Sequence, residues 1–131
     1  MKPRRSCLAL PATNARMAAK AAASAADQVI LDLEDAVAPA DKAAARAGAV
    51  AALRELDFGR AVRSVRINDV ESPWCRDDID AVVAGAGDAL DVVVVPKVGD
   101  AEHVRYVESR LPGNVALDVQ IESAAGTSGT G

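Results

Sequence analysis

Length, composition and charge exclude several classes of protein. The chain has 131 residues, half of them hydrophobic, which is enough to bury a core and predicts one globular domain rather than a disordered chain. A formal net charge of −4 and a total of three aromatic side chains argue against a nucleic-acid-binding module, because such modules attract phosphates with cations and stack bases on aromatic rings.

The amino-terminal residues predict neither a targeting signal nor a membrane segment. After the basic start, Pro11, Asn14 and Arg16 interrupt the apolar region that a signal peptide requires. Further along the chain, no apolar run approaches the roughly 18 residues of a membrane span. We therefore expect a cytoplasmic protein that binds neither membranes nor nucleic acid.

The first expected elements are a short buried strand over residues 6–10 and an alanine-rich helix that Thr13 or Asn14 caps. The helix carries Arg16 and Lys20 four positions apart, and therefore on one face. Such a pair usually forms the solvated side of a helix. A helix that starts directly above a site would instead aim the two cations at a phosphate.

The two cysteines are not expected to act chemically. Cys7 and Cys75 lie far apart in the sequence, and neither belongs to a CxxC motif or to a Cys/His cluster, so metal binding through cysteine is not expected. Cys7 lies in the apolar first strand, where a cysteine behaves as a small core residue. Cys75, at the start of a later helix, has no feature of a nucleophile.

The stretch over residues 28–37 organises the rest of the chain. Its apolar run passes into Asp32, Glu34 and Asp35 without an intervening turn residue, a pattern typical of a buried parallel strand whose last residues enter a site. If the strand continues, Asp32 and Glu34 share one face and Asp35 points to the other. The spacing leaves open an alternative, in which Glu34 and Asp35 begin the loop before the next helix, where acidic residues suit the helix N-terminus.

The remaining sequence predicts further strand and helix alternation. The expected elements are a helix over residues 39–56, a strand over 63–68, a helix from about 73 to 85, a strand over 91–97, a helix over 100–110 and a strand over 115–122. Asp77 and Asp78 are interpreted as N-terminal charges of the third helix. A small polar run over residues 127–131 is expected to form a tail, so that the domain occupies residues 1–126.

Charged residues stand at or just after the ends of four of these strands, namely Glu34, Arg66, Lys97 and Glu122. Strand and helix alternation with short connections predicts right-handed βαβ units and a parallel sheet. Ligands of such sheets bind at the carboxyl ends of the strands, so we expect these side chains to converge. One structural alternative is an open doubly wound sheet of the flavodoxin type, which the strand order 1-2-3-4-5 would exclude.

Six motifs occur in the order, and at the strand ends, in which a known family carries them. They are Arg5–Leu8 with Pro11, Arg16-Met17 with Lys20-Ala21, Ala26-Asp27 with Leu31–Val37, Pro39 and Lys42, Val65–Asn68, Val95–Val98 and Gln120–Gly126. Over about residues 4–126 the chain resembles the citrate lyase beta-subunit-like branch of the HpcH/HpaI aldolase superfamily.

The resemblance implies a (β/α)8 barrel that uses Mg²⁺ to cleave or form a carbon–carbon bond between an acyl-thioester and a 2-oxo acid. It implies that Arg66 binds the carboxylate of the oxo acid and that Glu122 is a metal ligand. It places Glu34 and Asp35 close to the metal, through its waters, and Lys97 at the mouth of the site. Without the resemblance, Arg66 is as well explained by an ion pair with Glu34 or Glu122.

The resemblance also implies partners. Arg16 and Lys20 match basic positions in a segment near a coenzyme A arm, so the expected substrates are an acyl-CoA or acyl-carrier thioester and a 2-oxo acid. A citryl-, citramalyl- or malyl-thioester would suit such a lyase. In a full-length form we expect a homo-oligomer.

The chain departs from the family pattern at one point. The family continues with a second metal carboxylate after the sixth strand, whereas five strands are predicted here. A full barrel needs about 250 residues, so we expect about five βα units of an incomplete barrel. The alternative function is therefore a truncated, non-catalytic barrel fragment that binds an acyl-CoA or a partner chain.

Overall fold

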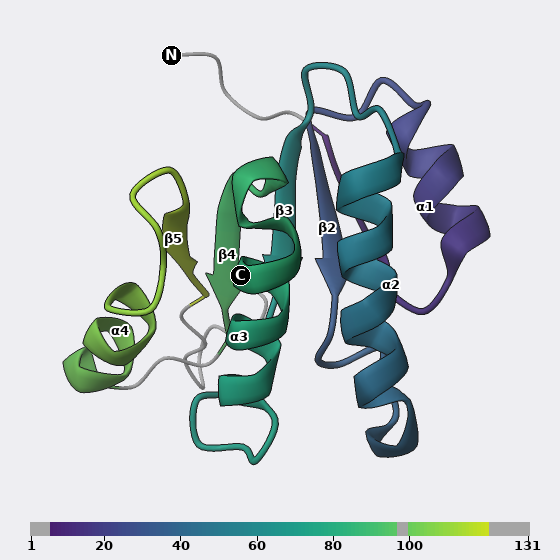
Figure 1. Ribbon diagram of the computed structural model, residues 1–131. Coiled ribbons are helices and arrows are strands. Elements are labelled where there is room, and N and C mark those ends of the chain that lie inside the picture. The colour runs from purple at the N-terminus through teal and green to yellow at the C-terminus, as the bar shows by residue number, and fades with distance from the viewer. Residues whose placement is uncertain (1–5, 97–99, 121–131) are drawn as a thin grey trace, which may run out of the picture.

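A computed structural model describes residues 6–96 and 100–120 of the chain. Strands and helices alternate along these residues (Figure 1). The strands are β1 (Cys7–Pro11), β2 (Gln28–Asp32), β3 (Val62–Arg66), β4 (Val92–Val95) and β5 (Ala116–Val119). The helices are α1 (Ala15–Ala22), α2 (Lys42–Glu55), α3 (Cys75–Ala86) and α4 (Ala101–Glu108), with short 3-10 turns η1 (Pro39–Asp41) and η2 (Gly87–Ala89). The predicted order of elements is thus confirmed.

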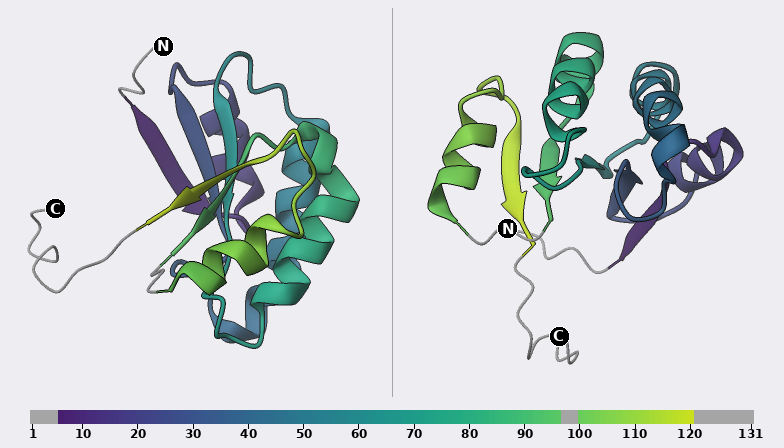
Figure 2. Two further views of the ribbon diagram at one scale, coloured as in Figure 1. Left: turned by 90° about the vertical axis from the view of Figure 1, so that its left-hand side faces the viewer. Right: turned by 90° about the horizontal axis from the view of Figure 1, so that it is seen from below.

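The five strands form one parallel sheet in the order β1-β2-β3-β4-β5. This order excludes the doubly wound alternative, in which the first strand lies inside the sheet. The helices gather on one side of the sheet (Figure 2), as right-handed crossovers between neighbouring parallel strands require. The arrangement is that of consecutive βα units of a (β/α)8 barrel, and the predicted fold class is confirmed.

The two faces of the sheet differ in chemistry because successive residues of a strand point to opposite sides. Val29, Leu31 and Val65 are at most 1% exposed and belong to the hydrophobic core. On the opposite face, Asp32 stands level with Arg66, and the same row continues through β4 to β5. The sheet therefore buries apolar side chains against the helices and presents Asp32 and Arg66 side by side near its carboxyl edge.

Local capping explains where the helices begin. Of the two candidates for the cap of α1, the side chain of Asn14 takes the role by accepting a hydrogen bond from the Met17 amide at 2.9 Å. Asp100 caps α4 in the same way, with the Glu102 amide at 2.8 Å. Each cap satisfies an amide that the first turn of the helix leaves without an intrahelical partner. Among the described helices, none has the length and apolar content to cross a membrane.

The first strand is more exposed than predicted. Cys7 is exposed and Leu8 retains 42% of its accessible surface, so the prediction that Cys7 is a core residue is wrong. The reason is the place of β1 in the sheet, because within the described residues it pairs with β2 alone and stands at an edge. An apolar strand is buried only when neighbours cover both of its sides.

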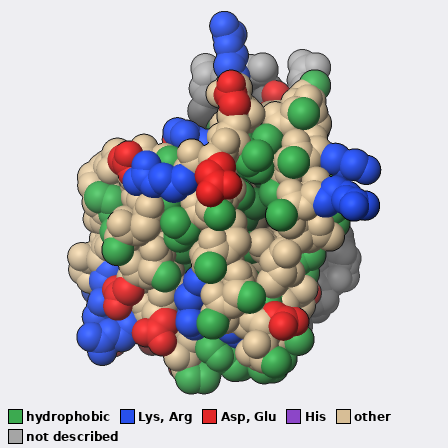
Figure 3. Space-filling view, turned by 45° about the vertical axis from the view of Figure 1, so that its right-hand side comes forward, with side chains coloured by type: hydrophobic (Ala, Val, Ile, Leu, Met, Phe, Trp, Pro, Cys, Tyr) green, Lys and Arg blue, Asp and Glu red, His purple; other side chains and the backbone are tan. Residues whose placement is uncertain are grey.

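On the molecular face shown in Figure 3, acidic and basic side chains are interspersed with hydrophobic ones.

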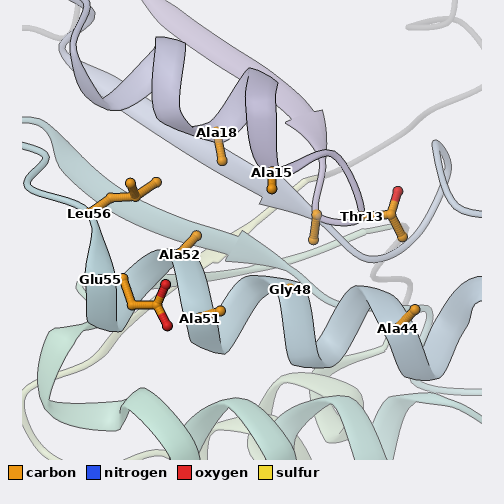
Figure 4. Close-up of a pocket in the computed structure, with 10 residues that line it drawn as sticks. Thr13, Ala15, Ala18, Ala44, Gly48, Ala51, Ala52, Glu55 and Leu56 are labelled. Carbon is orange, nitrogen blue, oxygen red and sulfur yellow. The ribbon is translucent and has the colours of Figure 1, made fainter.

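Helices α1 and α2 pack closely through small side chains, which line a groove between them (Figure 4). At Gly48, α2 lies close to the turn between β1 and α1, because an added Cβ would lie 2.2 Å from the carbonyl oxygen of Ala12. The contact is with backbone, so a larger residue cannot be accommodated by a side-chain rotation.

We expect Gly48→Ala to lower the free energy of unfolding by about 1–3 kcal/mol, the usual cost of overpacking. The direction is informative because alanine in a helix interior is otherwise favoured over glycine by about 1 kcal/mol. Urea denaturation of the two proteins measures the difference. Ala47→Gly, at an exposed position of the same helix, is the control for helix propensity. An unchanged or increased stability of Gly48→Ala would contradict the close packing.

Candidate functional site

The central feature of the carboxyl edge is an ion pair between Asp32, the last residue of β2, and Arg66, the last residue of β3. Arg66 Nε donates to Asp32 Oδ1 at 2.8 Å, and Arg66 Nη2 donates to Asp32 Oδ2 at 2.7 Å. The side chain of Asp32 is 2% exposed and that of Arg66 is 21% exposed. Two parallel hydrogen bonds between planar groups fix the orientation of the guanidinium.

Asp32 also anchors the loop that follows β2. Its Oδ1 accepts from the Glu34 amide and its Oδ2 from the Ala36 amide, each at 2.9 Å. With the two bonds from Arg66, the carboxylate accepts four hydrogen bonds, which is about the number of lone pairs it offers. Asp32 is therefore a structural anchor for the loop and for Arg66, and has no oxygen left over for a metal ion.

The pKa values of this pair follow from its surroundings. Burial by itself would raise the pKa of Asp32, but hydrogen bonds from Arg66 and from two loop amides together hold it below its usual value. The pKa of Arg66 is raised by its hydrogen bonds to Asp32, and the charges of Glu34 and Asp35 act in the same direction. Both groups are therefore charged at neutral pH.

Glu34 and Asp35 lie in the loop, because β2 ends at Asp32. The interpretation in which the strand continues through Glu34 is therefore wrong, and the loop alternative holds. Glu34 Oε1 lies 3.8 Å from Arg66 Nε, and Asp35 is exposed beside it. The sequence also allowed an ion pair of Arg66 with Glu34. The structure has this ion pair, but it is longer than the one with Asp32, which is the main partner of Arg66.

The outer edge of the Arg66 guanidinium faces the end of β5. Arg66 Nη1 lies 3.5 Å from Oε1 of Gln120, an exposed residue that follows β5 directly. The carboxyl ends of β2, β3 and β5 therefore meet, although β4 lies between β3 and β5 in the sheet. The prediction that Glu122 joins them remains a prediction, because Glu122 lies outside the described residues.

A second polar cluster lies buried beneath the loop. Asp78, which is 0% exposed, accepts hydrogen bonds from the Asn68 amide at 2.8 Å, from Asn68 Nδ2 at 2.6 Å and from Arg46 Nε at 2.8 Å. Asn68 Nδ2 also donates to the Leu33 carbonyl at 3.0 Å. Asp78 stands in the first turn of α3, as predicted, but its carboxylate is turned inward, where it accepts hydrogen bonds from Asn68 and Arg46.

The other predicted site residues are placed less centrally. Lys97 lies outside the described residues. Arg16 and Lys20 are both exposed on α1, and Lys20 lines a shallow hydrophobic hollow with Leu8 and Met17. Within residues 6–96 and 100–120, no group of three or more His, Cys, Asp or Glu side chains is arranged to hold a metal ion.

The environment of Cys75 does not favour reactivity. Cys75 is buried in α3, and burial raises the pKa of its thiol to about 12. A thiol with such a pKa is protonated at neutral pH and is a poor nucleophile. The expectation that Cys75 has no chemical role agrees with this environment.

Sequence reasoning placed Asp32 at the edge of a site but did not identify it as the partner of Arg66, and it did not foresee that Asp78 is buried. The signal for Asp32 was its place at the end of a buried run, where an isolated carboxylate needs a cationic partner. The matching cation, Arg66, stands at the end of the next strand. Neighbouring parallel strands bring such end residues level with each other.

The comparisons with known proteins agree on one family. A family model described as HpcH/HpaI aldolase/citrate lyase matches residues 5–128. The L-malyl-CoA/beta-methylmalyl-CoA lyase of Cereibacter sphaeroides is 45% identical over 135 residues, which cover 95% of this chain and 42% of the lyase. The (3S)-malyl-CoA thioesterase of the same organism is 42% identical over 124 residues, with the same shares covered.

A solved structure agrees with these matches. The citrate lyase beta subunit of Mycobacterium tuberculosis, complexed with oxaloacetate and magnesium, superposes with a TM-score of 0.70 at 37% identity. The match covers 93% of this chain and 49% of that protein. The chain spans about 42% of the length of the curated relatives it matches.

Proposed function

This chain belongs to the HpcH/HpaI aldolase/citrate lyase family, and from that premise we propose that it forms part of the active site of a Mg²⁺-dependent carbon–carbon lyase. The proposed substrate is a malyl-, citramalyl- or citryl-thioester, which is cleaved to an acyl-thioester and a 2-oxo acid. The observation that carries the proposal is the fixed guanidinium of Arg66 at the carboxyl edge of the sheet, with acidic side chains beside it. The matched citrate lyase beta subunit, complexed with oxaloacetate and magnesium, supports it.

Arg66 is proposed to bind the carboxylate of the oxo acid through its outer edge. Asp32 occupies the edge formed by Nε and Nη2, so a substrate carboxylate would meet Nη1 and the second N–H of Nη2. Because Asp32 holds the guanidinium in place before substrate arrives, little side-chain freedom is lost on binding. A planar carboxylate then accepts two parallel hydrogen bonds, and its reacting carbon is oriented.

The donor set at this edge fits Mg²⁺. Glu34 and Asp35 offer carboxylate oxygens in the loop next to Arg66, and Glu122 is proposed as a direct ligand. Mg²⁺ takes one or two carboxylates and keeps several waters, so Glu34 and Asp35 are proposed to hold it through those waters. The bound ion would polarise the carbonyl group of the oxo acid.

The thioester half of the substrate is proposed to reach the site from the side of α1. Arg16 and Lys20 are proposed to meet the anionic groups of the carrier, and Lys97 is proposed to bind substrate at the mouth of the site. The malyl-CoA relatives favour coenzyme A over an acyl-carrier protein. We further propose that the domain occupies residues 1–126, with residues 127–131 as a polar tail, and that a full-length form is a homo-oligomer.

A second candidate is hydrolysis of the thioester, favoured by one observation. The relative described as a malyl-CoA thioesterase matches the same share of this chain nearly as well as the lyase does. The two reactions differ in their products. Carbon–carbon cleavage of malyl-CoA yields glyoxylate and acetyl-CoA, whereas hydrolysis yields malate and free coenzyme A.

The test is Mg²⁺-dependent conversion of malyl-CoA by a full-length form, with both product pairs measured. We expect glyoxylate to appear with Mg²⁺ and to disappear with a chelator. Glu122→Gln should weaken Mg²⁺ binding by at least about tenfold and lower turnover with it, because the amide loses the charge that a hard cation prefers. Calorimetry with Mg²⁺ measures the first effect.

Glu108→Gln, at an exposed position on α4, is the matched control and should bind Mg²⁺ like the unchanged protein. The chain of 131 residues is expected to bind Mg²⁺ weakly or not at all. Tight binding by this chain would mean that Glu34 or Asp35 is a direct ligand. If a full-length form gave neither product pair, the alternative of a non-catalytic fragment that binds an acyl-CoA or a partner chain would be favoured.

A further inference from the structure

Lys42 is a buried cation to which the proposed function assigns no role. It is the first residue of α2 and is 5% exposed. Its Nζ donates to the carbonyl oxygens of Leu33 at 3.0 Å and of Glu34 at 2.8 Å, and lies 5.1 Å from the centroid of the Trp74 ring. An ammonium has three N–H groups, and two carbonyls and an aromatic face provide a partner for each.

The location of Lys42 is unfavourable for a helix. The first turn of a helix has a partial positive charge, so cations are favoured in the last turn and disfavoured in the first. Burial of an ammonium adds a desolvation cost unless its hydrogen bonds are made. Lys42 contacts the loop that follows β2 (residues 33–37, the acidic loop). These contacts explain why a lysine stands at this position, whereas its place in the helix does not.

Lys42 and Asp32 hold the same loop through different backbone groups. Asp32 accepts the hydrogen bond of the Glu34 amide, and Lys42 donates to the carbonyl of the same residue. For Leu33, the amide donates to the Arg66 carbonyl at 2.9 Å, while the carbonyl accepts from Lys42 and Asn68. Both polar backbone groups of Leu33 and of Glu34 are thus held, each residue by a different combination of partners.

Helix α2 holds a second contact point on the same side. Arg46, four residues after Lys42, pairs with the buried Asp78, which in turn accepts from Asn68. Lys42 and Arg46 are neighbours on the helix surface because of this spacing. The start of α2 therefore supports the loop directly through Lys42, and indirectly through Arg46, Asp78 and Asn68.

We infer that Lys42 is a positioning residue for Glu34. It holds the Glu34 peptide so that the side chain stays beside Arg66, and it does not itself touch substrate, because its N–H groups are engaged and it is buried. The inference rests on the proposed function in assigning Glu34 to the metal and oxo-acid site. The fixed loop geometry stands without that assignment.

The test uses Lys42→Met, which keeps most of the side chain over Trp74 but removes the ammonium, together with Lys42→Arg. Amide hydrogen exchange of residues 33–37 is measured first, in the chain of 131 residues. We expect Lys42→Met to accelerate exchange there by about tenfold, the effect of losing one charged hydrogen bond, with β2 and β3 unchanged. Lys42→Arg, which can still donate to both carbonyls, should restore part of the protection.

The second measurement is Mg²⁺ binding by a full-length form in the presence of pyruvate. Lys42→Met is expected to weaken it about tenfold, while the inhibition constant of free coenzyme A stays unchanged. Arg105→Met removes an exposed cation on α4 and should affect neither quantity. Weaker Mg²⁺ binding with an unchanged inhibition constant of coenzyme A would indicate a role at the acidic loop, whereas a general loss of structure would change both.

Three outcomes would overturn the inference. Unchanged loop exchange in Lys42→Met would show that Lys42 does not hold the loop. Faster exchange throughout the sheet, in both Lys42 variants, would show a role in overall stability only. Faster loop exchange with unaltered Mg²⁺ binding would show that the position of the loop does not affect the proposed metal site. If the unchanged full-length protein bound no Mg²⁺, the proposed function would fail, and loop exchange would still decide whether Lys42 positions Glu34.

Discussion

Asp32→Asn is expected to lower the free energy of unfolding by about 3 kcal/mol, near the lower end of the cost of breaking a buried ion pair, because Arg66 keeps some contact with water. The amide keeps one accepting oxygen but turns a donor toward a region that already holds donors from Arg66, Glu34 and Ala36. At least two of those hydrogen bonds are therefore lost, and the partly buried guanidinium keeps only its longer ion pair with Glu34. Urea denaturation at pH 7 measures the change.

The same substitution should alter the pH dependence of stability. The pKa of Asp32 is lowered in the folded state, so its contribution is fully present above the unfolded pKa of about 4. It is lost as the pH falls through the lower, folded value, because protons then bind the folded state as well. The stability of the unchanged chain should therefore decline below about pH 4 more steeply than that of Asp32→Asn.

Asp118→Asn is the matched control for Asp32→Asn. Asp118 lies in the same row of the sheet, on β5, but is exposed, and the substitution should change stability by no more than about 0.5 kcal/mol. If the two variants were equally stable, the Asp32–Arg66 pair would not be the anchor of this edge. A residual acid dependence is expected in Asp32→Asn, since Asp91, paired with Arg63, also has a lowered pKa.

Arg66→Lys is expected to lower turnover of a full-length form by about 100-fold or more, corresponding to roughly 3 kcal/mol. A lysine keeps the charge but is a point donor, so it cannot hold both oxygens of Asp32 and two oxygens of a substrate carboxylate together. The loss should appear in oxo-acid binding, measured in the condensation direction. Mg²⁺ binding, measured by calorimetry, should stay nearly intact, because Arg66 is not a proposed ligand.

Arg63→Lys provides the control on the same strand. Arg63 pairs with Asp91 near the amino end of β3, away from the carboxyl edge, so its replacement should leave kcat/KM within about threefold of the unchanged enzyme. Equal losses in the two variants would indicate general destabilisation of β3. Full activity of Arg66→Lys would remove Arg66 from the substrate-binding role.

Much of the fold follows from local pattern. The run of valines at residues 92–95 predicts a strand buried on both faces, and β4 has this environment in the structure. Apolar runs of strand length separated by helical stretches with short connections admit few topologies, since right-handed crossovers restrict the choice. The strand order 1-2-3-4-5 was the part that composition and periodicity left open, and the pairing of the strands decided it in favour of the barrel type.

The candidate site was predictable in part. Arg66 and Glu34 were identified from their positions at the end of a strand and just beyond one, and the structure places them 3.8 Å apart. The main partner of Arg66 is Asp32, which lies 34 residues away in the sequence. Their pairing depends on the register between β2 and β3, and no local pattern contains that register.

The sequence by itself determined the order of strands and helices and the charge carried to each strand end, because both depend on residue type and local spacing. Only the tertiary structure decided which charges are buried. Asp78 and Lys42 are charged residues at helix starts that became buried partners of distant groups, whereas Cys7, in an apolar run, is exposed at the sheet edge. Burial and hydrogen bonding depend on which elements pack against a residue, and those elements are brought together by folding rather than by proximity in the chain.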